Sequence, residues 1–121
     1  MNNGRKISGG KYKRTRKKKL YEKMGQTRLV LLGDTKRKTM KTMGGNKKTI
    51  LLKADSVNLL VKGKMQQAII KNVEETPQNR FLARQNILMK GAIIETSLGK
   101  ARITNRPSQE GRINAILIGN E

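Results

Sequence analysis

The sequence contains no cysteine and no histidine among its 121 residues. Without cysteine, disulfide bonds and thiolate zinc sites are excluded. Without histidine, the usual metal ligand and the usual general base at neutral pH are missing. Aromatic side chains are also scarce, at two tyrosines and one phenylalanine. We therefore predict a modest aliphatic core that is stabilised by packing and hydrogen bonds, with no metal site and no cofactor.

Acidic residues are few, eight against 28 lysines and arginines. A magnesium-dependent nuclease needs two or three carboxylates that converge on the metal. Only Glu74 and Glu75 are neighbours, and adjacent residues of a strand point to opposite faces. Neither Ser8-Gly9-Gly10 nor Gly44-Gly45 belongs to a phosphate-binding loop of the type GxxxxGK[ST]. We predict that the protein is not an enzyme and has no small-molecule substrate.

Long hydrophobic runs are missing as well. The run at residues 29–32 has only four residues, whereas a membrane-spanning helix needs roughly 20. The basic N-terminal region is not followed by the apolar segment of a secretory signal, and it lacks the apolar face of an interfacial helix. We therefore expect no membrane association and no export.

What the chain has in excess is positive charge, with a net charge of +20 and a pI near 11.0. The charge is +9 over residues 1–24 (ten cations, one acid), +6 over residues 25–48 (seven, one) and +5 over residues 49–121 (eleven, six). A phosphate backbone releases counterions for each charge that is neutralised, so this balance predicts a nucleic-acid partner.

Residues 4–23 are the most basic part, with ten cations and one acid, Glu22. Ordering 20 residues costs roughly 20 to 40 kcal/mol, and the few apolar side chains present return only about 2 to 3 kcal/mol each. We predict an extended RNA-binding arm over residues 1–24, attached to a folded domain at residues 25–121. The alternative is a solvated tail that only keeps the protein soluble. The predicted RNA contacts of the arm are Arg5, Lys6, Lys11, Tyr12, Lys13, Arg14, Arg16, Lys17, Lys18 and Lys19, with Tyr12 available to stack on an unpaired base.

A second basic stretch covers residues 33–48. The turn signal Gly44-Gly45-Asn46 follows an alternating Thr and Met pattern and precedes an apolar run, which predicts a hairpin with a basic tip. A loose, solvated loop is the alternative. The predicted phosphate contacts here are Lys36, Arg37, Lys38, Lys41, Lys47 and Lys48.

The remaining residues contain short aliphatic runs separated by turn signals, which predicts an all-β domain. We count six strands, at residues 49–53, 56–61, 66–73, 91–96, 100–105 and 112–118, and such a set avoids exposed edges by closing into a barrel. In the fifth run, Ala101 and Ile103 are expected to be buried, while Arg102 and Arg106 face outward as candidate RNA contacts. In the sixth, apolar residues occupy both faces, which predicts a strand covered on both sides.

One helix is expected over residues 76–88, with Thr76 as its cap and Pro77 in its first turn. Arg80 and Arg84 lie four residues apart on one face and are candidate RNA contacts. Phe81 is expected to pack on the sheet. The alternative is a helix that closes the barrel and carries two solvated arginines.

Several segments together resemble one known family. The opening GRKISGGKYKRTRKKK, the segment KTMGGNKK, and above all NRFLARQNILMKGAIIETSLGKARITNRPSQEG are similar to the archaeal and eukaryotic ribosomal proteins of the S8e family, and the length resembles the short archaeal form. This resemblance implies a compact six-stranded β-barrel in a structural constituent of the small ribosomal subunit, located in the cytoplasm. Its implied partners are small-subunit ribosomal RNA and neighbouring ribosomal proteins.

We therefore expect a small six-stranded antiparallel β-barrel with one short helix and an extended basic N-terminal arm, acting as one copy rather than as a homo-oligomer. The alternative function is a general nucleic-acid-compacting protein or RNA chaperone, which the charge alone would also allow. A DNA-architectural protein usually offers a groove-entering helix or an intercalating wedge, and the only candidate helix here is short.

Overall fold

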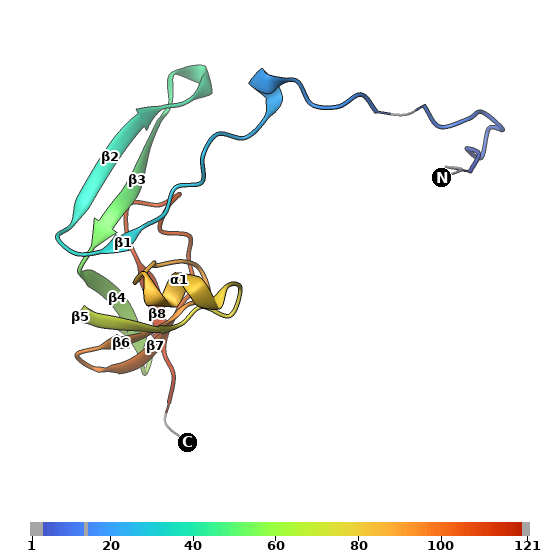
Figure 1. Cartoon of the computed structure of the whole chain (residues 1–121). Helices are drawn as coiled ribbons and strands as arrows, with labels where there is room; N and C mark the ends of the chain where they lie inside the picture. Colours follow the sequence, from blue (N-terminus) through green and yellow to red (C-terminus); the bar gives the residue numbers. More distant parts are fainter. Residues whose placement is uncertain (1–3, 14, 120–121) are drawn as a thin grey trace.

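The computed structural model describes residues 4–13 and 15–119. The chain forms a small β-barrel, a separate three-stranded sheet that projects from it, and an N-terminal arm that runs away from both (Figure 1). None of the helices in the described part is long and apolar enough to cross a membrane. The elements in chain order are η1 (Leu20–Glu22), β1 (Leu31–Leu32), β2 (Lys36–Lys41), η2 (Met43–Gly45), β3 (Lys47–Ala54), β4 (Ser56–Val61), β5 (Lys64–Glu75), α1 (Arg80–Arg84), β6 (Ile93–Thr96), β7 (Gly99–Ile103) and β8 (Asn114–Leu117).

The barrel closes in the order β4-β5-β6-β7-β8. The all-β prediction is therefore confirmed, but the strand count and pairing differ from the expected six antiparallel strands. The barrel has five strands, and the pair that closes it, β4 with β8, is parallel. The strand expected at residues 49–53 lies within β3, which pairs with β1 and β2 in the projecting sheet instead.

An antiparallel hairpin is present where the turn signal Gly44-Gly45-Asn46 predicted one. Its strands are β2 and β3, and Gly44 and Gly45 connect them with φ angles of 76° and 78°, which favour glycine. β3 is separated from β4 by Asp55 alone. The hairpin is therefore a direct continuation of the barrel wall.

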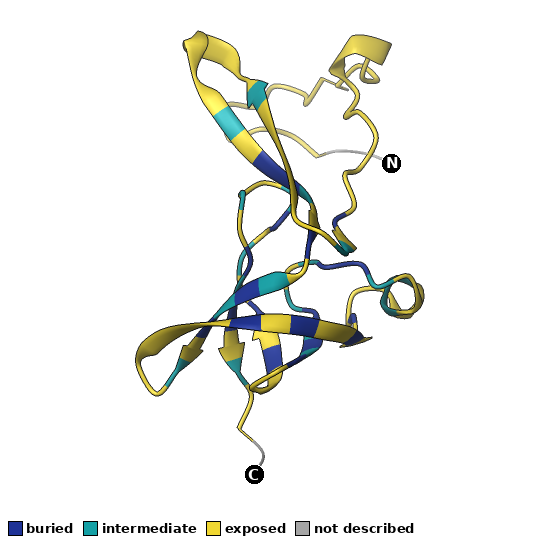
Figure 2. Ribbon diagram, turned by 90° about the vertical axis from the view of Figure 1, so that its left-hand side faces the viewer, coloured by how far each residue is buried: buried dark blue, intermediate teal, exposed yellow. Residues whose placement is uncertain are grey.

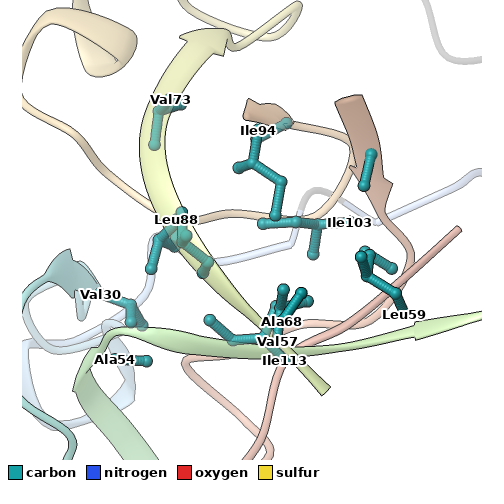
Figure 3. Packing of buried hydrophobic residues seen from close by; sticks show 14 of the residues in the cluster. Val30, Ala54, Val57, Leu59, Ala68, Val73, Leu88, Ile94, Ile103 and Ile113 are labelled. Carbon is teal, nitrogen blue, oxygen red and sulfur yellow. The ribbon is translucent and has the colours of Figure 1, made fainter. Parts of the chain in front are cut away.

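The core is aliphatic, as the composition predicts. Leu59, Ile94 and Ala101 are completely buried, and Figure 3 shows Leu59, Ile94 and Ile103 in the cluster of apolar side chains. The alternation along β7 is as expected, because Ala101 and Ile103 are buried while Arg102 is exposed. Val30 also joins this core, and its carbonyl accepts a hydrogen bond of 2.8 Å from the Leu88 N–H. The segment after the arm is thereby anchored to the barrel.

The helix is much shorter than expected. α1 begins at Arg80, and its cap is Asn79, whose side chain accepts a hydrogen bond from the Phe81 N–H. Thr76 is buried and donates its hydroxyl to the Asn79 carbonyl, so it supports the preceding turn instead of capping the helix. The prediction that Phe81 packs on the sheet is wrong, because this side chain is 70% exposed.

The expectation that the last strand is covered on both faces is also wrong within the described chain. Ala115 of β8 is buried, but Ile116 and Ile118 are exposed on the opposite face.

Candidate nucleic-acid interface

The arm is exposed throughout its described length (Figure 2). Among the described residues, the contacts near its start are local. The Lys6 N–H donates a hydrogen bond of 2.8 Å to the Gly10 carbonyl, and Gly9 in the turn has a φ angle of 79°. Arg5 and Lys11 form an isolated antiparallel β-bridge. Residues 6–10 thus form a tight turn. The arm keeps its cations in solvent, where an anionic partner has access to them.

Tyr12 is half exposed, and the Lys6 ammonium lies 5.8 Å from the centre of its ring. This geometry is a cation–π contact. The ammonium occupies one face of the ring. A base that stacks on Tyr12 would therefore use the other face.

A short loop of the arm is held by the single acid of this region. The Glu22 carboxylate accepts two hydrogen bonds from the Arg16 guanidinium, at 2.8 and 2.5 Å, and one from the Lys19 backbone N–H at 3.0 Å. These bonds, that of Arg16 first, hold the pKa of Glu22 below its usual value. The closed loop presents the side chains of Lys17, Lys18 and Lys19. Lys13 is exposed before it, and Arg14 lies outside the described residues.

The hairpin is the second concentration of charge. Between residues 36 and 54 the sequence has seven cations and no acid. Lys41 and Lys47 are directly paired across the two strands at its tip. Like charges in such a position destabilise a hairpin. Among the described residues the ion pairs are Arg16–Glu22 and Lys100–Glu74, so the hairpin cations have no carboxylate partner there. This tip is suited to an external anion.

Two hairpin cations also fix its position on the barrel. The Arg37 Nε donates a 2.8 Å hydrogen bond to the Gly111 carbonyl, and the Lys48 ammonium donates to the Gln109 side chain. Leu51, which is paired directly with Arg37 across the two strands, donates its N–H to the Pro107 carbonyl at 3.3 Å. Lys36 and Lys38 are exposed without such contacts to the barrel loop. The hairpin is thus tied to the loop at residues 107–111 along β3 as far as Lys48, and the exposed Lys41–Lys47 pair lies one position beyond the last of these contacts.

The four candidate arginines of the barrel region are all exposed, but they do not form one cluster. Arg80 and Arg84 lie on α1, and Arg102 lies on the outer face of β7. Arg106 follows β7 and lines a surface hollow together with Arg28 and Lys90.

Arg28 and Lys90 were missed by the sequence analysis. The sequence signal that could have located Arg28 is the apolar run at residues 29–32. Val30 of this run is buried and bonds to Leu88, which brings Arg28 beside Lys90 and Arg106. Three cations around one hollow add a third basic surface to the arm and the hairpin.

Within residues 4–13 and 15–119, no group of three or more His, Cys, Asp or Glu side chains could hold a metal ion. What the arrangement offers is charge at several separated positions, which suits contact with phosphates rather than the readout of base edges.

Comparison with known proteins agrees with this arrangement. The sequence pattern of the family "Ribosomal protein S8e" matches residues 1–118. The chain is 40% identical to small ribosomal subunit protein eS8 of Methanosarcina barkeri and 42% identical to that of Methanocorpusculum labreanum, in each case over 94% of this chain and 93% of the relative. It is also 40% identical to the eS8 protein of Haloarcula marismortui, with the same coverage. Because the match extends over almost the whole chain, including the arm, the hairpin and the barrel, this protein belongs to the ribosomal protein S8e family.

Proposed function

We propose that the protein is a structural constituent of the small ribosomal subunit, in which the barrel is the anchor and the arm and hairpin bind ribosomal RNA phosphates. Membership of the S8e family supports the place in the small subunit, and with it a cytoplasmic location, contact with ribosomal RNA and contact with neighbouring ribosomal proteins. The observation that carries the RNA-binding mechanism is the tip of the hairpin, where Lys41 and Lys47 face each other with no carboxylate nearby in the described chain.

The mechanism is electrostatic bridging. Two RNA segments that lie close together repel each other through their phosphates. The arm and the hairpin leave the barrel in different directions (Figure 1), so each places cations beside a different RNA segment. Each neutralised phosphate releases counterions, which favours the packed arrangement of the RNA. The proposed contacts are those predicted from the sequence, together with Arg28 and Lys90 beside Arg106.

Deletion of residues 1–24 tests the role of the arm and its separation from the folded domain. The deletion removes ten cations and one acid but none of the core residues. We expect an unchanged thermal unfolding transition and a weaker affinity for ribosomal RNA. The dependence of log Kobs on log salt should flatten by about 0.7 to 0.9 for each phosphate contact that is lost. An unchanged slope would contradict the role assigned to the arm.

Competition binding separates this function from general nucleic-acid compaction. Labelled small-subunit ribosomal RNA is challenged, at one near-physiological salt concentration, with unlabelled duplex DNA and with random-sequence RNA of equal length. We expect ribosomal RNA to be preferred by about a hundredfold or more, which corresponds to roughly 2.7 kcal/mol. Equal competition by all three would favour the compacting protein instead.

We further propose that the protein acts as a single copy, without membrane attachment and without a small-molecule ligand. Size-exclusion chromatography with light scattering checks the first point, because the free protein should elute with a mass of about one chain, 13.6 kDa.

A further inference from the structure

A row of apolar side chains crosses the outside of the barrel. Leu60 of β4 pairs with Met65 of β5 on one side and with Ile116 of β8 on the other, and Ile116 pairs in turn with Arg102 of β7. Directly paired residues of a sheet point to the same face. Leu59 and Ala115, their neighbours along the chain, are buried, so the row points outward.

The members of this row are well exposed. Met65 is 59% exposed, Ile116 47% and Leu60 38%, and Ile118 follows two positions after Ile116 with 39%. We call Met65, Leu60, Ile116 and Ile118 the outer apolar row. Within the described residues, nothing covers it. It occupies both partners of the parallel strand pair that closes the barrel.

The adjacent row on the same strands is polar. Asn58 of β4 pairs with Gln67 of β5 and with Asn114 of β8, and the side chains of Asn58 and Asn114 are 3.4 Å apart. The same three strands thus carry amides at one level and aliphatic side chains at the next. Exposed apolar side chains gain free energy when a partner removes them from water. A contiguous group of them therefore favours an apolar partner over water or phosphate.

Cations border the outer apolar row. Arg102, paired with Ile116, ends it on β7, and Lys62 lies in the turn that joins β4 to β5. Lys64 pairs with Val61 and not with a member of the row, so its side chain belongs to the other face of the sheet. At the far end, Ile118 shares a hollow with Glu95 and with Lys100, which forms an ion pair with Glu74. An apolar centre with a charged rim is the usual composition of a protein interface. The positive part of the rim, at Arg102 and Lys62, calls for negative groups on the partner.

We infer that the outer apolar row is the docking surface of a neighbouring protein of the small subunit, which contributes apolar side chains bordered by carboxylates. This inference rests on the proposed place in the small subunit. It assigns the two kinds of surface to two kinds of partner: the arm and the hairpin to RNA, and the outer face of β4, β8 and the end of β5 to protein. Arg102, a proposed RNA contact that is paired with Ile116, lies where the two surfaces meet. Met65, with its flexible thioether, adapts to the shape of the partner.

Because the chain has no cysteine, single cysteines report on each surface without background. The variants Leu60→Cys and Ile116→Cys probe the row, Thr39→Cys probes the hairpin, and Lys71→Cys is an exposed control on β5 away from the row. Each thiol is reacted with fluorescein maleimide in the free protein, with deproteinised ribosomal RNA, and in small subunits purified after replacement of the resident protein by the variant.

The two row thiols should react at least tenfold more slowly in assembled subunits than in the free protein, and at an unchanged rate with ribosomal RNA alone. The Lys71→Cys thiol should keep its rate in all three. A benzophenone maleimide attached to Ile116→Cys in subunits should then give, on irradiation, an adduct that resists ribonuclease and is identified by mass spectrometry as one ribosomal protein. Reversing the rim charge with Lys62→Glu should reduce the yield of that adduct at least tenfold, whereas Lys71→Glu should not.

An RNA adduct at Ile116→Cys, or protection by ribosomal RNA alone, would overturn the inference in favour of a nucleic-acid occupant. An unprotected row in subunits would mean that the surface is free, and an adduct whose yield is insensitive to rim reversal would exclude the acidic partner. The Thr39→Cys thiol separates the two proposals: if it is unprotected by ribosomal RNA while the protein adduct forms, the RNA role of the hairpin fails and the docking surface stands.

Discussion

Replacing both lysines at the hairpin tip by glutamine, in the double variant Lys41→Gln and Lys47→Gln, should weaken RNA binding without harming the fold. If each lysine contacts one phosphate, their loss reduces the salt slope of log Kobs by about 1.4 to 1.8. At 0.1 M salt the same loss corresponds to an affinity about 25- to 60-fold lower. The free energy of unfolding of the double variant should rise, because in the original protein the two ammonium groups face each other across β2 and β3. Relief of that repulsion stabilises the free protein by about 0.2 to 1 kcal/mol.

The assay is fluorescence anisotropy with labelled small-subunit ribosomal RNA between 50 and 200 mM salt, combined with urea unfolding of the free protein. The matched control is Lys64→Gln with Lys71→Gln, two exposed lysines on β5, which also changes the net charge from +20 to +18. The control should retain most of the salt slope. The reasoning is refuted if the control flattens the slope as much as the tip variant does, or if the tip variant is less stable than the original protein.

Three further outcomes follow from the structure. Leu59→Ala, at a completely buried position, should cost about 2 to 5 kcal/mol of unfolding free energy, whereas Leu60→Ala next to it should cost less than about 1 kcal/mol; similar losses in urea unfolding would mean that the row is part of the core. Arg102→Glu or Arg106→Glu should reduce incorporation into small subunits, measured by sucrose-gradient sedimentation, while circular dichroism of the free protein stays the same; an unfolded variant would make these arginines structural. The hydrogen bond from the Thr35 hydroxyl is the first cause that holds the pKa of Asp55 below its usual value. The stabilisation from this bond is present at neutral pH and is lost as pH falls through the depressed pKa, so the difference in unfolding free energy between the original protein and Thr35→Ala should shrink below about pH 4. A difference that grows on acidification would exclude this role.

Composition and short-range patterns were sufficient for much of the fold. The alternation around Arg102 places Ala101 and Ile103 inside, and the structure agrees because a strand buries every second residue regardless of which strands it pairs with. The exposed arm follows from its charge and its lack of apolar residues. The glycine pair at residues 44–45 fixes a hairpin because its φ angles are accessible mainly to glycine.

Pairing between distant strands was not predictable in the same way. Residues 49–53 look like any other barrel strand, and only the contacts of β3 with β1 and β2 place them in a second sheet. The parallel pairing of β4 with β8 joins segments about 55 residues apart and leaves no local signal. α1 is short because Thr76 and Asn79 bond within the preceding turn, a competition that propensity alone does not resolve.

The candidate site was predictable in part. Basic residues were identified by type, and the exposure of the arm and of the hairpin tip fits the roles assigned to them. The ties of Arg37 and Lys48 to the loop at residues 109–111 depend on tertiary contacts more than 60 residues apart in sequence. For the last strand, the alternation of apolar residues predicted cover on both faces, and the chain itself supplies cover on only one.

Because a single residue separates β3 from β4, a movement of the hairpin relative to the barrel would be a rotation about that residue. With eight residues in β3 at about 3.3 Å each, the tip stands about 26 Å from the base. A rotation of about 10° at the base would displace the tip by about 4.5 Å over that reach, close to the spacing of two adjacent strands. The bonds of Arg37, Lys48 and Leu51 to the loop at residues 107–111 therefore set where the tip lysines reach. For the proposed binding to RNA, this means that the barrel and the tip lysines would contact sites a fixed distance apart.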